Sequence, residues 1–239
     1  MLRIENLTKT YGSKRAVDDL SFSIPGGEIC AFIGHNGAGK TTTIKSVCGT
    51  MRFDSGDIFI DDISIKKDPI ACKSLTAYIP DSPEVYEFLT GIKFLNFVAD
   101  IYSIPPEARE SRIHKYSDMF ELTGDLAQPV GAYSHGMKQK LTIISALIHQ
   151  PRLMVLDEPF VGLDPKASRT LKDLMREVCN NGGAIFFSTH ILEVAEKLCD
   201  RVVIIKSGKL VASGYMDEVK GDSSLESIFF ELAEPEESA

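Results

Sequence analysis

Short apolar runs separated by turn residues make up the first part of the chain. The runs LRIENL (2–7) and DDLSFSI (18–24) alternate apolar and polar residues, whereas EICAFIG (28–34) is almost continuously apolar. Alternation is typical of a strand with one buried face, and a continuous run is typical of a strand buried on both faces. The turn residues Pro25-Gly26-Gly27 and Ser55-Gly56-Asp57 predict two hairpins between such strands.

The pattern becomes helical over residues 83–150. Apolar residues recur at helical spacing in 90–104, and Pro105-Pro106 ends that helix and opens the next, over 107–124. The run LTIISALI (141–148) suits a buried helix. These features predict a helical segment inserted into a chain that is otherwise rich in strands.

Apolar strands alternate with helices after residue 150. We expect strands at 152–159, 184–190 and 201–206 and helices at 165–183 and 191–200, followed by a hairpin over 201–214 and a short helix over 224–234. Strands and helices that alternate at this spacing are typical of a parallel α/β sheet. The predicted fold class is therefore α/β, with a helical insertion.

Composition and charge narrow the class of protein. The chain has 239 residues, 44% hydrophobic and 25% charged, which is ordinary for a globular domain. Its net charge of −8 argues against nucleic acid as a partner. Five cysteines without a C-x-x-C pair predict free thiols and a reducing compartment. No apolar run approaches the roughly 18 to 20 residues that cross a bilayer.

A glycine-rich turn between a predicted strand and a predicted helix carries the strongest chemical signal. It matches G-x-x-x-x-G-K-[ST] and reads Gly34-His35-Asn36-Gly37-Ala38-Gly39-Lys40-Thr41-Thr42. In such a P-loop, backbone N–H groups and the helix N-terminus surround phosphate oxygens. Lys40 can then reach the β- and γ-phosphates, and the Thr41 hydroxyl can bind Mg²⁺. The alternative is an ordinary glycine-rich turn.

A second acidic element follows the apolar strand LMVLDEP (153–159). Asp157 lies at the end of this strand, where its carboxylate can hold Mg²⁺ through water. Glu158 follows directly and can polarise the attacking water as a general base. The alternative reading is that this Asp-Glu-Pro sequence only caps a helix.

Three further motifs occur in a fixed order around these two. Tyr133-Ser134-His135-Gly136-Met137-Lys138-Gln139 precedes Asp157, and Gly162-Leu163-Asp164 and Ser188-Thr189-His190 follow it. The ordered set resembles the nucleotide-binding subunit of ABC transporters over residues 2–231. The Y-S-x-G-M-K-Q form and the final SLESIFFELAE resemble the branch with drug, antibiotic and bacteriocin-resistance exporters.

The resemblance implies an ABC ATPase fold and a division of the chain. Residues 1–82 and 151–220 would form the nucleotide-binding core of a P-loop NTPase with an N-terminal antiparallel β lobe. Residues 83–150 would form a helical subdomain that ends in the signature motif. Residues 221–239 would form a short helix and an acidic tail.

The resemblance also implies roles for single residues. Tyr11 matches the aromatic residue that stacks on adenine, and Val17 an apolar neighbour of the ribose or base. Ser134 and Gly136 match the signature motif, which contacts the γ-phosphate of ATP bound to the opposite subunit. Asp164 matches an aspartate at the subunit junction, and His190 the switch histidine that contacts the γ-phosphate and orients the water.

Each of these residues also has a purely structural reading. Tyr11 can be a half-buried aromatic at the end of a strand. Ser134 can cap the helix that begins at His135, and His190 can neighbour a helix N-cap. Capping and phosphate contact are compatible, because a helix N-terminus satisfies both.

The sequence departs from the family pattern at two places. The signature reads Tyr133-Ser134-His135-Gly136-Met137 where L-S-G-G-Q is commonest, yet the phosphate-contacting Ser134 and Gly136 remain. Asp81 stands where the family usually has Gln. Aspartate brings a full negative charge and no donor, although its oxygens can still bind Mg²⁺. We expect Asp81 to bind the metal and to change how this loop senses it.

The resemblance implies an ATP-hydrolysing subunit that uses ATP and Mg²⁺ to drive a separate membrane permease, most simply an exporter. It would act with a second copy of itself or a paralogous subunit, at the cytoplasmic face of the membrane, without nucleic acid. The alternatives are chromosome-maintenance and translation-associated ATPases. The former need long coiled coils, which Pro80, Pro83, Pro105, Pro106 and Pro129 interrupt. The latter join two such cassettes in one chain.

Overall fold

An antiparallel sheet forms the N-terminal lobe in the computed structural model, which describes residues 1–233. Its four strands are β1 (Leu2–Tyr11), β2 (Lys14–Ile24), β4 (Ser55–Ile60) and β5 (Ile63–Ser64), in the order β2-β1-β4-β5. Buried and less buried residues alternate through much of β2 and β4, as the sequence pattern predicts for strands with one buried face.

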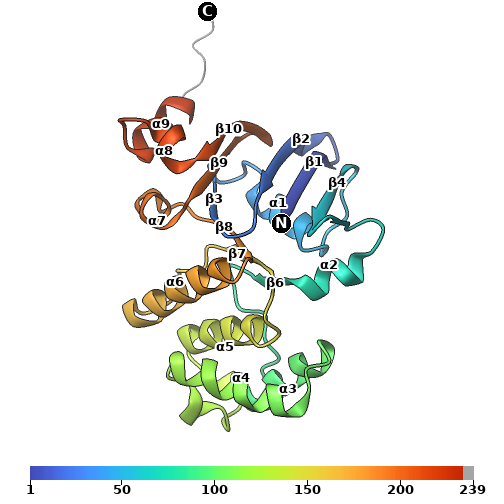
Figure 1. Cartoon of the computed structure of the whole chain (residues 1–239), viewed down its shortest axis with the longest axis vertical. Helices are drawn as coiled ribbons and strands as arrows, with labels where there is room; N and C mark the ends of the chain where they lie inside the picture. The colour runs from blue at the N-terminus through green and yellow to red at the C-terminus, as the bar shows by residue number, and fades with distance from the viewer. Residues whose placement is uncertain (234–239) are drawn as a thin grey trace, which may run out of the picture.

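A second sheet forms the centre of the molecule (Figure 1). Its six strands are β3 (Ile29–Ile33), β6 (Thr76–Ile79), β7 (Leu153–Asp157), β8 (Ala184–Ser188), β9 (Arg201–Lys206) and β10 (Lys209–Tyr215), in the order β10-β9-β3-β8-β7-β6. All neighbours are parallel except β9 and β10, which form the predicted hairpin. The predicted α/β fold class is confirmed.

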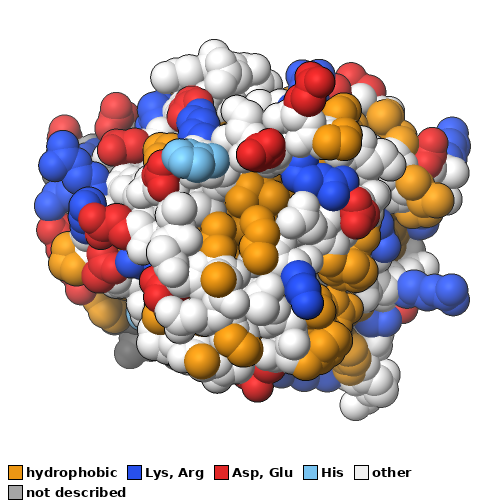
Figure 2. Space-filling view, turned by 90° about the horizontal axis from the view of Figure 1, so that it is seen from below, with side chains coloured by type: hydrophobic (Ala, Val, Ile, Leu, Met, Phe, Trp, Pro, Cys, Tyr) orange, Lys and Arg blue, Asp and Glu red, His pale blue; other side chains and the backbone are white. Residues whose placement is uncertain are grey.

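Helices cover the central sheet and form a separate arm. Those beside the sheets and at the C-terminal end are α1 (Lys40–Val47), α2 (Pro69–Leu75), α6 (Pro165–Asn180), α7 (Leu192–Leu198), α8 (Met216–Lys220) and α9 (Leu225–Ala233). The arm consists of α3 (Gly91–Ile101), α4 (Pro106–Met119) and α5 (His135–Leu147), at the opposite end of the molecule from α8 and α9 (Figure 1). Figure 2, seen from below, shows hydrophobic side chains gathered on this end among charged ones.

Strand β3 separates the two hydrophobic cores. Ile29, Ala31 and Ile33 belong to the core that includes the arm, α6 and α7, whereas Cys30 and Phe32 belong to the core shared with α1 and the antiparallel lobe. Successive side chains of a strand point to opposite faces, and both faces of β3 are covered, so all five residues are buried. Packing on both faces of β3 fixes the point at which the glycine-rich loop begins.

Two predicted hairpins are wrong. Pro25-Gly26-Gly27 does turn the chain, but β2 pairs with β1 and β3 pairs with β8 and β9, so this turn joins two sheets. Ser55 to Asp57 lie within β4, and the hairpin forms at Asp61 and Asp62, whose φ angles are 51° and 64°. Turn residues indicate where the direction changes, but distant strands decide which partners pair.

Three further expectations concern the cysteines, membrane-spanning segments and the C-terminal tail. All five cysteines are free and buried. Among residues 1–233 no helix is long and apolar enough to cross a membrane. The acidic tail, residues 234–239, lies outside the described part of the chain.

Candidate functional site

A cavity of about 390 Å³ opens where β3 leads through the glycine-rich loop into α1. The loop follows a close path: a Cβ at Gly39, whose φ is +110°, would lie 2.4 Å from the carbonyl oxygen of Ala16. A Cβ at Gly34 would lie 2.7 Å from the carbonyl oxygen of Ile205. Both positions therefore need glycine.

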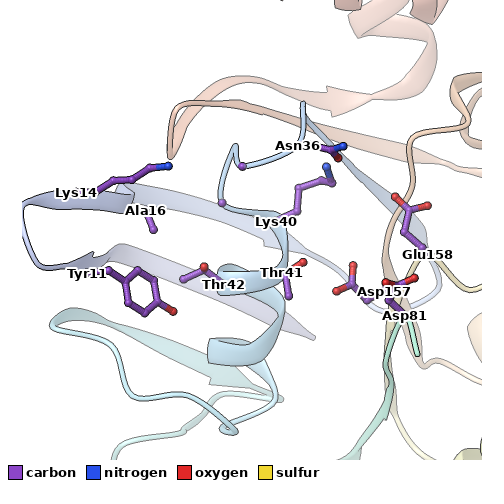
Figure 3. Close-up of a pocket in the computed structure, with 12 residues that line it drawn as sticks. Tyr11, Lys14, Ala16, Asn36, Lys40, Thr41, Thr42, Asp81, Asp157 and Glu158 are labelled. Atoms are coloured by element: carbon purple, nitrogen blue, oxygen red, sulfur yellow. The ribbon is translucent and has the colours of Figure 1, made fainter. Parts of the chain in front are cut away.

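The cavity lining comes from four parts of the chain. Asn36, Gly37, Gly39, Lys40, Thr41 and Thr42 contribute the loop and the start of α1. The others form two groups on either side of Lys40 (Figure 3): Tyr11, Lys14 and Ala16 on one, Asp81, Asp157 and Glu158 on the other. One end of the cavity is thus aromatic and basic, and the other is acidic.

Lys40 is folded onto its own loop. Its Nζ donates hydrogen bonds to the carbonyl oxygens of Gly34, at 2.5 Å, and of His35, at 3.3 Å. Burial lowers the pKa of Lys40, although Glu158 and Asp157 oppose this effect. These carbonyl contacts keep the buried ammonium partnered, and a phosphate in the cavity can take their place.

Asp157 and Glu158 share Ser188 as a hydrogen-bond partner, Asp157 through its carboxylate and Glu158 through its backbone N–H. Asp157 ends β7 and is 5% exposed, and its carboxylate accepts a hydrogen bond from the Ser188 hydroxyl. The backbone N–H of Glu158 lies 3.1 Å from that same hydroxyl oxygen and 3.3 Å from the Ser188 carbonyl oxygen. Ser188 opens the Ser-Thr-His motif, but its position in the sequence does not predict this role. It anchors both acidic residues to β8.

Glu158 and His190 face one another. The φ of Glu158 is +48°, a left-handed conformation that is uncommon for this residue type. Its Oε2 lies 2.9 Å from His190 Nδ1 and 3.3 Å from the backbone nitrogen of His190. The His190 side chain is 63% exposed, so this pair lies at the edge of the site. A carboxylate oriented by an imidazole can position a water and accept its proton.

The aromatic end of the cavity differs in detail from the expectation. Tyr11 lines it, and its hydroxyl lies 2.8 Å from the Met51 sulfur. Val17 is fully buried in the core, and its neighbour Ala16 lines the cavity instead, because adjacent side chains of β2 point to opposite sides. Lys14 was not predicted, but it is paired with Tyr11 across the hairpin.

Ser134, Gly136 and Asp164 lie outside this cavity. Ser134 caps α5, where its hydroxyl accepts a hydrogen bond from the Met137 N–H at 3.2 Å. A Cβ at Gly136 would lie 3.0 Å from the carbonyl oxygen of Gly162, so these two motifs are neighbours.

Asp164 is held in place by charge and by capping. Its carboxylate lies 2.7 Å from Lys140 Nζ and accepts a hydrogen bond from the Ala167 N–H at 2.8 Å, which caps α6. The hydrogen bond from Lys140, and then that from Ala167, lower the pKa of Asp164. Asp164 and Ser134 are both exposed, which leaves them accessible to a second molecule.

Metal ligands are not preassembled. Among residues 1–233, no three His, Cys, Asp or Glu side chains are close enough together to hold a metal ion. Asp81 lines the cavity with Asp157 and Glu158, and Thr41 borders it. These oxygens are the ligand type that Mg²⁺ prefers, with the remaining positions left to water and phosphate.

Comparisons with known proteins agree with this geometry. The family model described as "ABC transporter" matches residues 17–161. The chain is 34% identical to the ABC-type transporter ATP-binding protein EcsA of Bacillus subtilis, covering 97% of this chain and 96% of EcsA. It is 35% identical to the SkfA peptide export ATP-binding protein SkfE of the same organism, covering 91% and 90%. A solved ATP binding subunit of an ABC transporter has a TM-score of 0.93 at 36% identity, covering 97% and 99%.

Proposed function

Because the chain belongs to the ABC transporter family, as an ATP-binding subunit, we propose that it hydrolyses MgATP between two subunits to drive a separate permease. Nucleotide binding and ATP hydrolysis are the activities of this family, and this chain is such an ATPase. The proposal adds where the ATP is enclosed, which residues act on it and what the energy drives.

The observation that carries the proposal is the separation of two half-sites. Lys40, Asp157 and Glu158 line the cavity, whereas Ser134 and Asp164 are exposed outside it. A triphosphate in this cavity would have its outer oxygens open to solvent. The helix N-terminus behind Ser134 is a donor for such oxygens. A second copy, placed head to tail, or a paralogous subunit can supply it.

We assign the chemistry to the acidic end of the cavity. Lys40 would turn from its carbonyl partners to the phosphates, where its charge is best compensated. Thr41 and Asp157, with Asp81, would hold Mg²⁺, which supplies positive charge against the phosphate oxygens. Glu158, oriented by His190, would position the attacking water and accept its proton.

We assign permease docking to an exposed aromatic surface on the arm. Tyr86 contacts Phe88 and Phe97, with ring centroids 5.8 and 5.5 Å apart, and Ile101 lies one helical turn beyond Phe97. Phe88 is 81% exposed and Ile101 62%. Exposed apolar patches of this kind mark interaction sites, and Figure 2 shows this end of the molecule. Docking there would place the chain at the cytoplasmic face of the membrane.

We propose that the direction of transport is export. The relative SkfE is named for peptide export, and the Y-S-x-G-M-K-Q form belongs to the exporter branch that the sequence resembles. The chromosome-maintenance alternative has no support here, because the longest helix between the P-loop and Ser134 is α4, with 14 residues. That length excludes a long coiled coil in this interval.

The subunit arrangement is tested by measuring molecular mass in solution. Glu158→Gln should slow hydrolysis enough to trap ATP, and this variant should then form a dimer with MgATP and remain a monomer with MgADP. Closure of the dimer would depend on the γ-phosphate, because this group reaches both half-sites and is present in ATP but not in ADP. A variant that binds ATP but remains a monomer at high protein concentration, alone and with its permease, would contradict the shared site.

Permease docking is tested by co-purification from membranes. Phe88→Asp should abolish recovery with the permease, while basal ATP hydrolysis stays within about twofold because the aromatic surface is outside the cavity. Leu210→Asp is the matched control, since Leu210 is an exposed apolar residue at 37% but lies on β10, away from the arm (Figure 1). Equal recovery of Phe88→Asp and the unmodified protein would remove this surface from the interface.

A further inference from the structure

The glycine-rich loop is in contact with the C-terminal helix. The ring of His35, the second residue of the loop, lies 4.6 Å from the ring of Phe229 on α9, with an interplanar angle of 43°. A tilted pair at this distance is a favourable aromatic contact. Phe229 is partly buried and packs against the larger hydrophobic core. The contact thus joins the phosphate-binding loop to an element almost two hundred residues later in the chain.

The two halves of this loop are held differently. The inner half is tied to the hairpin between β9 and β10, where the Gly208 N–H donates to the Ala38 carbonyl oxygen at 2.9 Å. Gly39, next to Ala38, fits closely against Ala16. The outer half, His35 to Gly37, is exposed. Phe229 packs against the first side chain of this exposed half.

The position of α9 is fixed by its first turn. Leu225 is fully buried, and its backbone N–H donates to Glu196 Oε2 at 3.2 Å. Glu196 lies on α7 and also pairs with Lys220 at 3.1 Å. Ile228, one turn after Leu225, packs against the same core. Phe229 is therefore presented by a helix that is anchored elsewhere.

The backbone of His35 belongs to the phosphate cradle. Its carbonyl oxygen accepts hydrogen bonds from Lys40 Nζ, at 3.3 Å, and from the Ala38 N–H, at 3.0 Å. Any rotation of the His35 peptide therefore disturbs both the lysine and the turn of the loop. A ring packed on the His35 side chain restricts that rotation without touching the nucleotide.

We propose that Phe229 is a positioning residue for nucleotide binding, acting through His35 on the outer half of the P-loop. The proposal rests on the proposed placement of ATP phosphates at this loop. A cradle held in its binding conformation loses less conformational entropy when the ligand arrives. Phe229 therefore favours the bound state. The chemical step, which uses Glu158, does not depend on it.

This division predicts a change in KM without a change in kcat. Phe229→Ala should raise the KM for ATP, and the Kd for MgADP, by about 3- to 10-fold, the size expected for one lost aromatic pair. The kcat should stay within about twofold. Phe229→Tyr should keep the nucleotide affinity of the unmodified protein, because the aromatic ring remains. Phe230→Ala is the matched comparison: its ring is 57% exposed and packs against Phe229, with centroids 6.2 Å apart, whereas the ring contact of His35 is with Phe229, so Phe230→Ala should have the smaller effect.

A double-mutant cycle separates the contact from general packing. If Phe229 acts through His35, the variant with both His35→Ala and Phe229→Ala should bind no more weakly than His35→Ala alone. If the two effects on affinity add fully, the ring contact is not the route, and the proposal fails. A lower melting temperature of Phe229→Ala with unchanged KM would likewise mean that the residue only packs, and would overturn the proposal.

Fluorescence can show whether nucleotide binding reaches position 229, which a residue that only packs in the core would not report. The chain has no tryptophan, so Phe229→Trp introduces a single indole beside His35. Its emission should change as MgADP is added, with the same Kd that calorimetry gives, whereas Phe230→Trp should respond little. Adding Lys40→Ala should abolish the change. If ADP binds by calorimetry and the Phe229→Trp emission stays constant, the proposal is overturned. If the unmodified chain binds no nucleotide, the proposed function fails instead.

Discussion

The nucleotide cavity and the surface around Ser134 contrast in burial. Lys40 and Asp157 are 8% and 5% exposed, and they lie at the start of α1 and at the end of β7, a fully buried strand of the central sheet. Ser134 and Asp164 are exposed, and Ser134 begins a helix of the arm. The chain therefore forms the nucleotide cavity with one region and presents a second set of polar groups on another.

This difference indicates how the work is divided within the chain. The arm is joined to the core by ion pairs as well as by hydrophobic packing, for example Lys140 with Asp164 at 2.7 Å and Lys115 with Glu177 at 3.1 Å. The Lys115–Glu177 pair is half exposed and contributes little stability, whereas the Lys140 side chain is only 16% exposed. The arm and the central sheet thus share one hydrophobic core, and Ser134 and Asp164 lie exposed at its surface.

The largest effect should come from the cavity itself. Glu158→Gln should lower the hydrolysis rate by about 10²- to 10⁴-fold, because it removes the group that accepts the proton from water. ATP affinity should change only a few-fold, since Lys40 and the loop remain. Steady-state phosphate release and calorimetry measure the two quantities. Hydrolysis at the rate of the unmodified protein would remove Glu158 from this role.

Lys40→Ala is the counterpart of that variant within the same cavity. It should lose nucleotide binding as well as hydrolysis, because the charge against the phosphates disappears. The pair thus separates binding from chemistry. A Lys40→Ala protein that binds ATP as tightly as the unmodified chain would contradict the placement of the phosphates.

A smaller effect, confined to the second region, should follow Ser134→Arg. The larger side chain should block the partner's phosphates, abolish the ATP-dependent dimer of Glu158→Gln and lower hydrolysis about 10-fold or more. Its own cavity should still bind MgADP normally, since Ser134 lies outside it. Light scattering and calorimetry on the same sample test both halves of this expectation. Loss of ADP binding would mean that the two regions are not independent.

The same contrast explains what the sequence could predict. The P-loop and the Asp157-Glu158 pair each stand at the carboxyl end of a strongly apolar strand, β3 or β7, and such ends meet at one edge of a parallel sheet, so local pattern predicts that they meet. Residues brought in by tertiary packing gave no such signal. Ser188, on a neighbouring strand, bonds the Asp157 carboxylate and the Glu158 backbone N–H, and Phe229 reaches the P-loop from the C-terminal helix.

The errors have a physical cause of the same kind. Val17 was expected at the cavity, but the pleat of β2 turns it into the core and leaves Ala16 at the ligand side. The turn at Pro25 was read as a hairpin, although its two strands enter different sheets. A one-residue change of face, or a change of pairing partner, is decided by the whole core and not by the local pattern.

Two histidines differ in burial, and the buried one makes the stability of the fold depend on pH. His190 is exposed beside Glu158, whereas His149, at the end of α5, stacks on Tyr102 with ring centroids 3.8 Å apart. Burial lowers the pKa of His149 to about 4, below the value of about 6.5 in an unfolded chain. As pH falls below about 6.5, the unfolded state takes up a proton that the folded state refuses, so stability is lost until about pH 4.

The expected loss is measurable by urea unfolding at pH 7.5 and pH 5. His149 should account for about 2 kcal/mol of the difference between these two values. His149→Phe, which keeps the ring stacked on Tyr102, should remove that part of the pH dependence. His114→Gln is the control, because the His114 side chain is 70% exposed. An unchanged pH dependence in His149→Phe would contradict the burial effect.

The smallest effect should come from Asp81, which lies at the junction of the two regions. It lies two residues after the end of β6, lines the cavity beside Asp157 and precedes the arm. Asp81→Gln removes a negative charge that would attract Mg²⁺ but keeps an oxygen ligand. ATP affinity should therefore stay within a few-fold, while the Mg²⁺ concentration for half-maximal hydrolysis rises about 3-fold or more and stimulation by the permease changes. Asp81→Asn, which keeps the length and removes only the charge, distinguishes the effect of charge from that of reach. If Asp81→Gln abolished all basal hydrolysis while remaining folded, Asp81 would belong to the chemistry of the cavity and not to its communication with the arm.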